Sequence, residues 1–151
     1  MYVTIEEFTE RTLMPAADVE QLNALSPRFL ELTLREMSSR IDAQLAKRYA
    51  TPFKNTVPDI VKGWVVRTTT PRAYLRLGIN PSDAQFIAAR EDEERAWKEI
   101  AEAADAQNGL YDLPLRADTS ASGIVKTATL AYSEATPYGF LDSQRRRAYG
   151  Q

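Results

Sequence analysis

The chain has neither cysteine nor histidine among its 151 residues. Without cysteine it has no disulfide framework and no thiolate metal site. Without histidine it lacks the side chain that most often serves as a general base or a metal ligand near neutral pH. No glycine-rich phosphate loop, Gly-x-Ser-x-Gly elbow or zinc-binding helix motif is present. We therefore expect no catalytic residues, no metal ligands and no cofactor, and we expect that the protein is not an enzyme.

Long apolar runs are also missing. No stretch approaches the roughly 20 apolar residues of a membrane-spanning helix, and the N-terminus has no basic segment followed by an apolar one. The sequence therefore predicts a soluble protein that is made in the cytoplasm and has no membrane partner. Lys and Arg number 19 against 21 Asp and Glu, a net charge of −2, which argues against a protein whose whole surface wraps nucleic acid.

What is present is a series of helix signals, and the first lie close to the N-terminus. Thr4 and Glu7 have the spacing of a capping box, in which the hydroxyl and the carboxylate each accept a hydrogen bond from the other residue's backbone amide. We expect a short helix here that ends at Pro15. A second short turn is expected to direct three apolar side chains inward, those of Val19, Leu22 and Leu25.

Two longer helices are predicted to follow. Ser26-Pro27 is a typical start, a capping residue followed by a proline in the first turn. From there apolar residues recur every three or four positions, which is the pattern of an amphipathic helix. The next helix is expected to begin at Pro58 and to end at Gly78, with a kink or a restart at Thr70 because Pro71 removes a backbone donor.

A third long helix is expected to start at Asn80-Pro81-Ser82 and to end at Asn108-Gly109. Its predicted inward face holds Phe86, Ala89, Glu93, Trp97, Ile100 and Ala104. Across the three long helices the predicted core is Leu30, Leu34, Met37, Ile41, Leu45, Trp64, Phe86 and Trp97. The sequence thus predicts a mainly α fold, a small bundle of three long helices with short N-terminal helices, spanning residues 1–115.

An acidic run at Glu91 to Glu94 is the best candidate for a metal site, and the sequence argues against it. Helix residues one or two apart do not face each other, so only Glu91 and Glu94 share a face. Arg90, Arg95 and Lys98 are close enough to neutralise them. A solvated, ion-paired helix face is the preferred interpretation.

Residues 116–151 form the second predicted unit, an extended C-terminal arm that includes a β-prone segment at 124–132. The segment before it, Leu110 to Leu115, is expected to leave the bundle. The arm carries a net charge of +2 and the body −4. A chain segment that retains apolar groups gains by burying them against a partner. The candidate partner-binding residues are Ile124, Leu130, Tyr132, Tyr138, Phe140, Leu141, Arg145, Arg146 and Arg147.

Three segments resemble the head–tail connector (adaptor) proteins of tailed bacteriophages. They are Tyr2 to Phe8, the helix end at Ile41 to Tyr49, and Thr51-Pro52-Phe53 followed by Val57-Pro58. The resemblance covers about residues 2–115. An uninterrupted second helix is usual in that family, so Pro71 is a departure, and the arm matches nothing in it.

The resemblance implies a structural protein of the virion neck, made in the bacterial host. Such proteins assemble as a ring of about twelve copies beneath the portal protein. The ring continues the channel for double-stranded DNA, without sequence-specific binding, and meets the tail or a stopper or tail-completion protein. An arm grips the portal or a neighbouring subunit. If the third helix faces the lumen of such a ring, its acidic residues Glu91, Asp92 and Glu94 would repel phosphates and let DNA slide.

A second interpretation remains open from the sequence. The same pattern fits a monomeric helical protein-binding module with a peptide-like tail, which would have no ring symmetry and no place in a particle.

Overall fold

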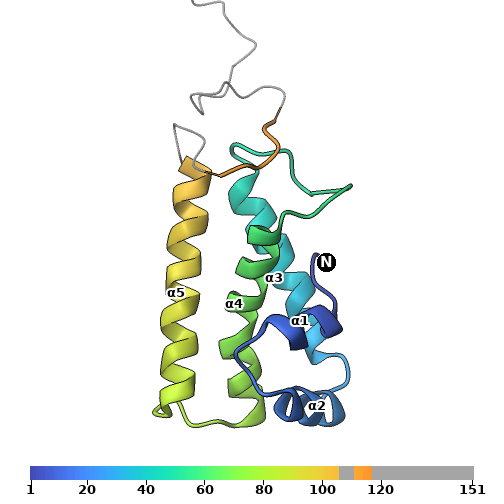
Figure 1. Cartoon of the computed structure of the whole chain (residues 1–151), viewed down its shortest axis with the longest axis vertical. Helices are drawn as coiled ribbons and strands as arrows, with labels where there is room; N and C mark the ends of the chain where they lie inside the picture. Colours follow the sequence, from blue (N-terminus) through green and yellow to red (C-terminus); the bar gives the residue numbers. More distant parts are fainter. Residues whose placement is uncertain (106–110, 117–151) are drawn as a thin grey trace, which may run out of the picture.

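The computed structural model describes residues 1–105 and 111–116. The elements are α1 (Ile5–Arg11), α2 (Ala16–Leu25), α3 (Phe29–Leu45), α4 (Asp59–Leu77) and α5 (Ala84–Asp105). The three long helices contact one another pairwise, and α4 runs antiparallel to both α3 and α5 (Figure 1). The described residues contain no strand, only an isolated antiparallel bridge between Tyr49 and Leu115. The prediction of a mainly α fold with three long helices is confirmed.

The two short helices pack against α4, and α1 also contacts α2. The capping box is confirmed, because the amide of Glu7 donates to Thr4 Oγ1 and the amide of Thr4 donates to the Glu7 carboxylate, both at 3.2 Å. Pro15 separates the two helices and occupies the position before α2. The prediction that the Leu25 side chain points inward was wrong, since this side chain is 64% exposed at the end of α2.

Helix α3 buries its whole predicted apolar stripe, from Leu30 to Leu45. The predicted cap at Ser26 was wrong, because α3 begins at Phe29 and no side chain caps it. A capping side chain bonds the second or third helical amide, and Ser26 lies too far upstream to reach them. Its hydroxyl instead accepts hydrogen bonds from the guanidinium of Arg76 on α4, at 3.0 and 3.2 Å.

Helix α4 begins after Pro58 and ends at Gly78, as predicted, and Gly78 has the left-handed φ of 82° that closes many helices. Of the kink or restart predicted at Thr70, the restart is wrong, because α4 continues through Pro71 to Leu77. The proline removes only the hydrogen bond to the carbonyl of Arg67. Burial on nearly all sides holds this part of α4 in place, since Thr68, Thr69, Thr70, Pro71, Ala73 and Tyr74 are all buried.

Helix α5 starts at Ala84, two residues later than the sequence signal. The Asn80 side chain accepts a hydrogen bond from the amide of Ser82 at 3.0 Å, so the predicted start forms a turn that leads into the helix. The described part of α5 ends at Asp105, and the predicted end at Asn108-Gly109 lies outside the described residues.

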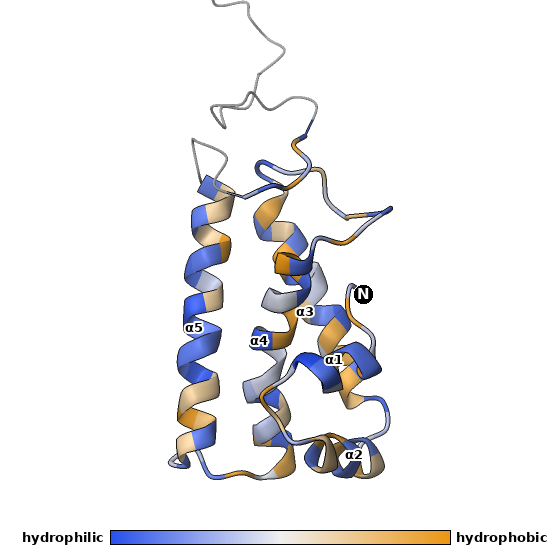
Figure 2. Ribbon diagram, viewed as in Figure 1, coloured by the Kyte–Doolittle hydropathy of each residue, from blue (hydrophilic) through white to orange (hydrophobic). Residues whose placement is uncertain are grey.

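The core lies between α3, α4 and α5 and extends under the N-terminal segment. Seven of the eight predicted core side chains are buried, namely Leu30, Leu34, Met37, Ile41, Leu45, Trp64 and Phe86. Trp97 packs against this core but is only partly buried. The residue before it, Ala96, takes the inward position. Figure 2 shows how hydrophilic residues dominate along α5, whereas apolar residues gather where the other helices meet.

Candidate partner-binding site

A cluster around Asp42 joins three parts of the chain. The Tyr2 hydroxyl donates to the Asp42 carboxylate and accepts from the amide of Phe53 at 3.0 Å. The amide of Tyr2 donates to Ser38 Oγ at 3.2 Å. Burial raises the pKa of the Asp42 carboxyl and of the Tyr2 hydroxyl. The cluster therefore fixes the N-terminus and the loop after α3 to the same helix.

This cluster brings together the three segments singled out in the sequence. Each contributes one member, Tyr2 from the first, Asp42 from the helix end and Phe53 from the loop. The rings of Tyr2 and Phe53 also pack at 5.7 Å between centroids. Sequence reasoning noted the segments but not their contact, because no local signal links positions this far apart in the chain.

The segment 111–116, here called the arm root, returns to the bundle. Leu113 is only 6% exposed, and the Tyr111 ring packs edge-on against Trp64 at 5.6 Å. The expectation that residues 110–115 leave the bundle was therefore wrong for this part. The physical reason is that Tyr111, beside Trp64 of α4, and Leu113 remove apolar surface from water by packing against the core.

Backbone hydrogen bonds then hold the arm root against the turn that follows α3. The amide of Ala50 donates to the carbonyl of Pro114 at 2.8 Å, and that of Arg116 donates to the carbonyl of Arg48 at 3.0 Å. The Arg116 guanidinium adds a bond to the carbonyl of Ala46 at 2.8 Å. The arm thus departs from a fixed point at one end of the bundle (Figure 1).

The partner-binding residues predicted on the arm lie outside the described residues. They are Ile124, Leu130, Tyr132, Tyr138, Phe140, Leu141, Arg145, Arg146 and Arg147. The β-prone segment 124–132 lies there too. The structure does place Arg116, the residue at which the predicted arm begins.

The acidic residues of α5 do not form one exposed set. Glu91 and Glu94 are exposed. Asp92 instead forms an ion pair with Arg67 of α4, at 3.1 Å, so its charge is neutralised within the molecule. The exposed positions of α5 carry three basic residues (Arg90, Arg95, Lys98) and four acidic ones (Glu91, Glu94, Glu102, Asp105). The exposed positions of this helix therefore carry a net charge of −1, and the lumen-facing role of Glu91, Asp92 and Glu94 stays a prediction.

Arg67 links α4 to α5 through several contacts. Its guanidinium bonds Glu99 at 2.7 Å and the backbone carbonyl of Asp92 at 3.3 Å, in addition to the Asp92 carboxylate. The indole N–H of Trp64 donates to the same Glu99 carboxylate at 2.8 Å. The hydrogen bond from Arg67 holds the pKa of Glu99 below its usual value, so this carboxylate is ionised at neutral pH. Removal of Arg67 would leave two carboxylates uncompensated at the helix interface.

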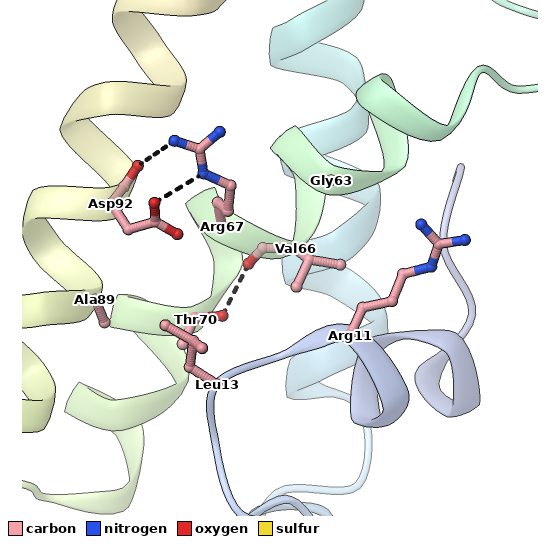
Figure 3. Close-up of a pocket in the computed structure, with 8 residues that line it drawn as sticks. All are labelled: Arg11, Leu13, Gly63, Val66, Arg67, Thr70, Ala89 and Asp92. Atoms are coloured by element: carbon pink, nitrogen blue, oxygen red, sulfur yellow. Dashed lines mark hydrogen bonds and ion pairs between the residues drawn. The ribbon is translucent and has the colours of Figure 1, made fainter.

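Beside this ion-pair network lies a pocket of about 390 Å³ between α4, α5 and the loop after α1, here called the Leu13 pocket (Figure 3). Its lining residues are Arg11, Leu13, Gly63, Val66, Arg67, Thr70, Ala89 and Asp92. Arg67 points toward Asp92, whereas Arg11 lies on the other side of the pocket (Figure 3). Thr12 and Thr70 share a hydrogen bond of 2.9 Å, which holds the loop that carries Leu13 against α4.

Gly63 gives the Leu13 pocket its free space. A Cβ atom added at Gly63 would meet nothing within 4 Å. Leu13 itself is 71% exposed at the edge of this pocket. The pocket therefore offers apolar surface that no other described residue covers.

A second pocket, of about 380 Å³, lies between α3 and α4 and is here called the Leu75 pocket. It is lined by Phe29, Thr33, Glu36, Arg72, Leu75 and Arg76. Arg72 pairs with Glu36 at 3.2 Å, and the Arg76 guanidinium lies 5.6 Å from the centre of the Phe29 ring. Sequence reasoning found neither pocket, because each combines residues from separate helices.

Two kinds of feature are missing from the described part of the chain. Within residues 1–105 and 111–116, no group of three or more acidic side chains is placed to hold a metal ion. Over the same residues, no helix combines the length and the apolar composition that crossing a membrane requires.

The fold and these surfaces define a small helical bundle with pockets on its surface and a segment, residues 111–116, that is hydrogen-bonded to one end of the bundle. Residues 4–127 match the protein family described as Bacteriophage Mu, Gp36, and the chain belongs to this family. It is therefore a bacteriophage protein, which agrees with the resemblance at that level. No curated protein and no solved structure matches the chain. The family match includes the arm root and ends before Tyr138.

Proposed function

We propose that this protein is a structural component of the virion, a head–tail connector that forms a ring beneath the portal. Membership of a bacteriophage family supports this role. The observation that carries it is the anchored arm root, because bonds from the arm root to the turn after α3 fix where the arm begins. A helical body with an arm held at one end suits a subunit that joins neighbours in an assembly.

The arm is the proposed anchor to the portal or to a neighbouring subunit. When many copies are held in a ring, each docking event becomes effectively intramolecular, and weak individual contacts sum to a stable attachment. The other face of the ring would meet the tail, a stopper or a tail-completion protein. No catalytic role and no cofactor is part of this proposal.

The charge distribution is compatible with passage of DNA through such a ring. The exposed positions of α5 are nearly neutral, and the whole chain has a net charge of −2. Phosphate binding depends on clustered basic residues, which release counterions from DNA. A lumen lined by a nearly neutral helix surface would let double-stranded DNA slide without sticking.

Quantitative mass spectrometry of purified phage particles tests the proposal. About twelve copies per particle, equal to the number of portal subunits, are expected for a closed ring. Empty heads that have not received the connector provide the control, and they should contain the portal without this protein. Absence of the chain from complete, tailed particles would overturn the proposal. That outcome would favour a free helical binding module, which the two surface pockets also fit.

A further inference from the structure

The two pockets lie on opposite sides of α4. The Leu13 pocket takes four residues of α4, from Gly63 to Thr70, and the Leu75 pocket takes three, from Arg72 to Arg76. At a helical rotation of about 100° per residue, the mean directions of these two sets differ by roughly 180°. The loop after α1 is held on the first side, because Thr12 shares a hydrogen bond with Thr70. The bundle therefore presents two different surfaces that face in nearly opposite directions.

The surface on the first side, here called the N-terminal surface, is formed by residues 1–25 and is acidic. These residues include α1, α2 and the loop that carries Leu13, and they hold five acidic side chains against the single arginine Arg11. Glu6 and Glu10 lie four residues apart on one face of α1, and both are exposed. Neither belongs to an ion pair within the part of the chain that the structure describes. The N-terminal surface thus combines an exposed leucine with negative charge that no ion pair offsets.

The surface on the other side, here called the α3–α4 surface, is basic. It is formed by residues 26–36 and 71–78, which border the Leu75 pocket and hold four arginines against two glutamates, a net charge of +2. Both glutamates are already paired with arginines of the same surface. Arg28 and Arg76 make no ion pair with any described carboxylate. Both side chains are exposed, so their charges are accessible to a partner.

Exposed leucines border the Leu75 pocket on both of its helices. Leu75 of α4 lies at its edge, and Leu32 of α3 follows three residues after Phe29, which lines the pocket. Residues three apart are neighbours on a helix surface, so Leu32 extends the apolar edge of the pocket. Both leucines are about half exposed. The α3–α4 surface thus offers an apolar pocket among cations, whereas the N-terminal surface offers an exposed leucine among carboxylates.

We propose that Leu13 of one copy of this chain docks into the Leu75 pocket of a neighbouring copy, with Glu10 of the first facing Arg76 of the second. Contact of either surface with itself would bring like charges together, so the pairing of the two different surfaces is favoured. Two different surfaces on opposite sides of a subunit make a head-to-tail contact, which closes into a ring when the rotation fits. The inference rests on the proposed ring and names the surfaces through which its neighbouring copies meet.

The absence of cysteine permits disulfide trapping in the full chain. Leu13→Cys protein is mixed with Leu75→Cys protein, one of them carrying a tag that changes its gel mobility, and disulfide formation is followed under mild oxidation. The matched control replaces Leu75→Cys by Ile87→Cys, because Ile87 is another exposed apolar residue and lies on α5 outside both pockets. The first mixture is expected to form the mixed dimer at least about tenfold faster than the control mixture. Equal rates, or faster dimers between identical variants, would overturn the head-to-tail contact.

The double variant Leu13→Cys with Leu75→Cys separates this proposal from the connector role. The two positions lie on different sides of α4, so the expected products are covalent oligomers and not a disulfide within one chain. In phage particles made with this variant, a ladder of products that ends at about twelve copies would support both proposals. Particles that contain the protein but give no ladder would overturn the docking contact alone. A ladder in purified protein together with absence from tailed particles would support the docking contact and overturn the connector role.

Charge reversal provides a second readout in the mixed-dimer assay. Glu10→Arg in the Leu13→Cys protein is expected to slow the reaction about two- to fivefold, and Arg76→Glu in the Leu75→Cys protein should restore most of the rate when the two are combined. Glu102→Arg is the matched control, because it reverses an exposed charge on α5 outside both pockets and should leave the rate unchanged. Circular dichroism checks that each variant keeps its helix content. No slowing by Glu10→Arg, or no recovery in the combination, would overturn the proposed orientation of α1 against Arg76.

Discussion

At the scale of single residues, Asp42 shows how a carboxylate stabilises the fold by joining segments. It accepts from the Tyr2 hydroxyl, while its backbone carbonyl accepts from Thr51 Oγ1 at 3.3 Å. The side chain is half-buried, and burial raises its pKa in spite of the hydrogen bond from Tyr2 and the nearby amino terminus. The ionised form of Asp42 is therefore less stable in the folded protein than in water.

This shift predicts a pH-dependent effect of Asp42→Asn. Because the pKa of Asp42 is higher in the folded than in the unfolded chain, its favourable contribution is complete below the unfolded pKa of about 3.9. That contribution is lost as the pH rises through the folded pKa. An asparagine keeps an acceptor for Tyr2 but does not titrate. The free energy of unfolding of the variant, relative to the wild type, should therefore rise as the pH is raised from about 4 toward neutrality.

Urea unfolding followed by tryptophan fluorescence between pH 4 and 7 measures this difference. Near pH 4 the two proteins should agree to within about 1 kcal/mol, the scale of one neutral hydrogen bond. Asp83→Asn on the exposed turn before α5 is the control, with an expected effect within about 0.5 kcal/mol at every pH. A difference between Asp42→Asn and wild type that stays constant with pH would contradict the assignment.

At the scale of elements, α4 contacts all four other helices of the described chain. It also shows that tertiary packing can outweigh a low local helix propensity. Pro71 lies inside it without ending it. Two glycines have different conformations, since Gly63 lies within the helix while Gly78 ends it with a left-handed backbone. The same substitution at these two positions should therefore have opposite effects.

Gly63→Ala is expected to raise the free energy of unfolding by about 0.5–1 kcal/mol, because alanine restricts the unfolded chain and meets no neighbour in the fold. Gly78→Ala is expected to lower it by about 1–2 kcal/mol, since a Cβ atom is unfavourable at φ 82°. Chemical denaturation of both variants under one set of conditions tests the pair. If both substitutions changed the free energy of unfolding in the same direction, the different backbone conformations of Gly63 and Gly78 would not account for their effects.

At the scale of the whole molecule, the arm root ties residues 111–116 to the bundle. Tyr111 and Leu113 pack against the core of the bundle. The boundary predicted at residue 115 stays a prediction, because the structure describes no residue after Arg116.

Two truncations follow from this division. A chain that ends at Tyr132 should keep the helix content and urea midpoint of the full protein, because every described core residue of the bundle precedes it. It should nevertheless lose binding to the portal, as the proposed anchor is removed. A chain that ends at Leu110 should be destabilised by about 2–4 kcal/mol, since it loses the apolar contacts of Tyr111 and Leu113.

Circular dichroism, urea unfolding and a pull-down with the portal protein measure these effects. The truncation at Leu110 is the positive control, because it shows that the assay detects a loss of core contacts. Normal portal binding by the chain that ends at Tyr132 would show that the arm is not the anchor. Equal stability of the two truncated chains would contradict the role given to the arm root.

The sequence alone determined the features that depend on neighbouring residues. The capping box at Thr4, the start of α4 at Pro58, its end at Gly78 and the buried stripe of α3 all follow from local backbone chemistry and helical period. The mainly α class follows from the same signals. These predictions succeeded because the interactions that control them lie within about one helical turn.

Tertiary structure decided the features that join distant residues. It allowed Pro71 within α4, left Leu25 exposed, paired Asp92 with Arg67 and returned the arm root to the bundle. Packing of the helices removes apolar surface of Pro71 and of Leu113 from water, whereas Asp92 is held by its ion pair with Arg67. Neither pocket has a sequence signal either, because Leu13, Gly63 and Ala89 lie on three separate parts of the chain until folding brings them together.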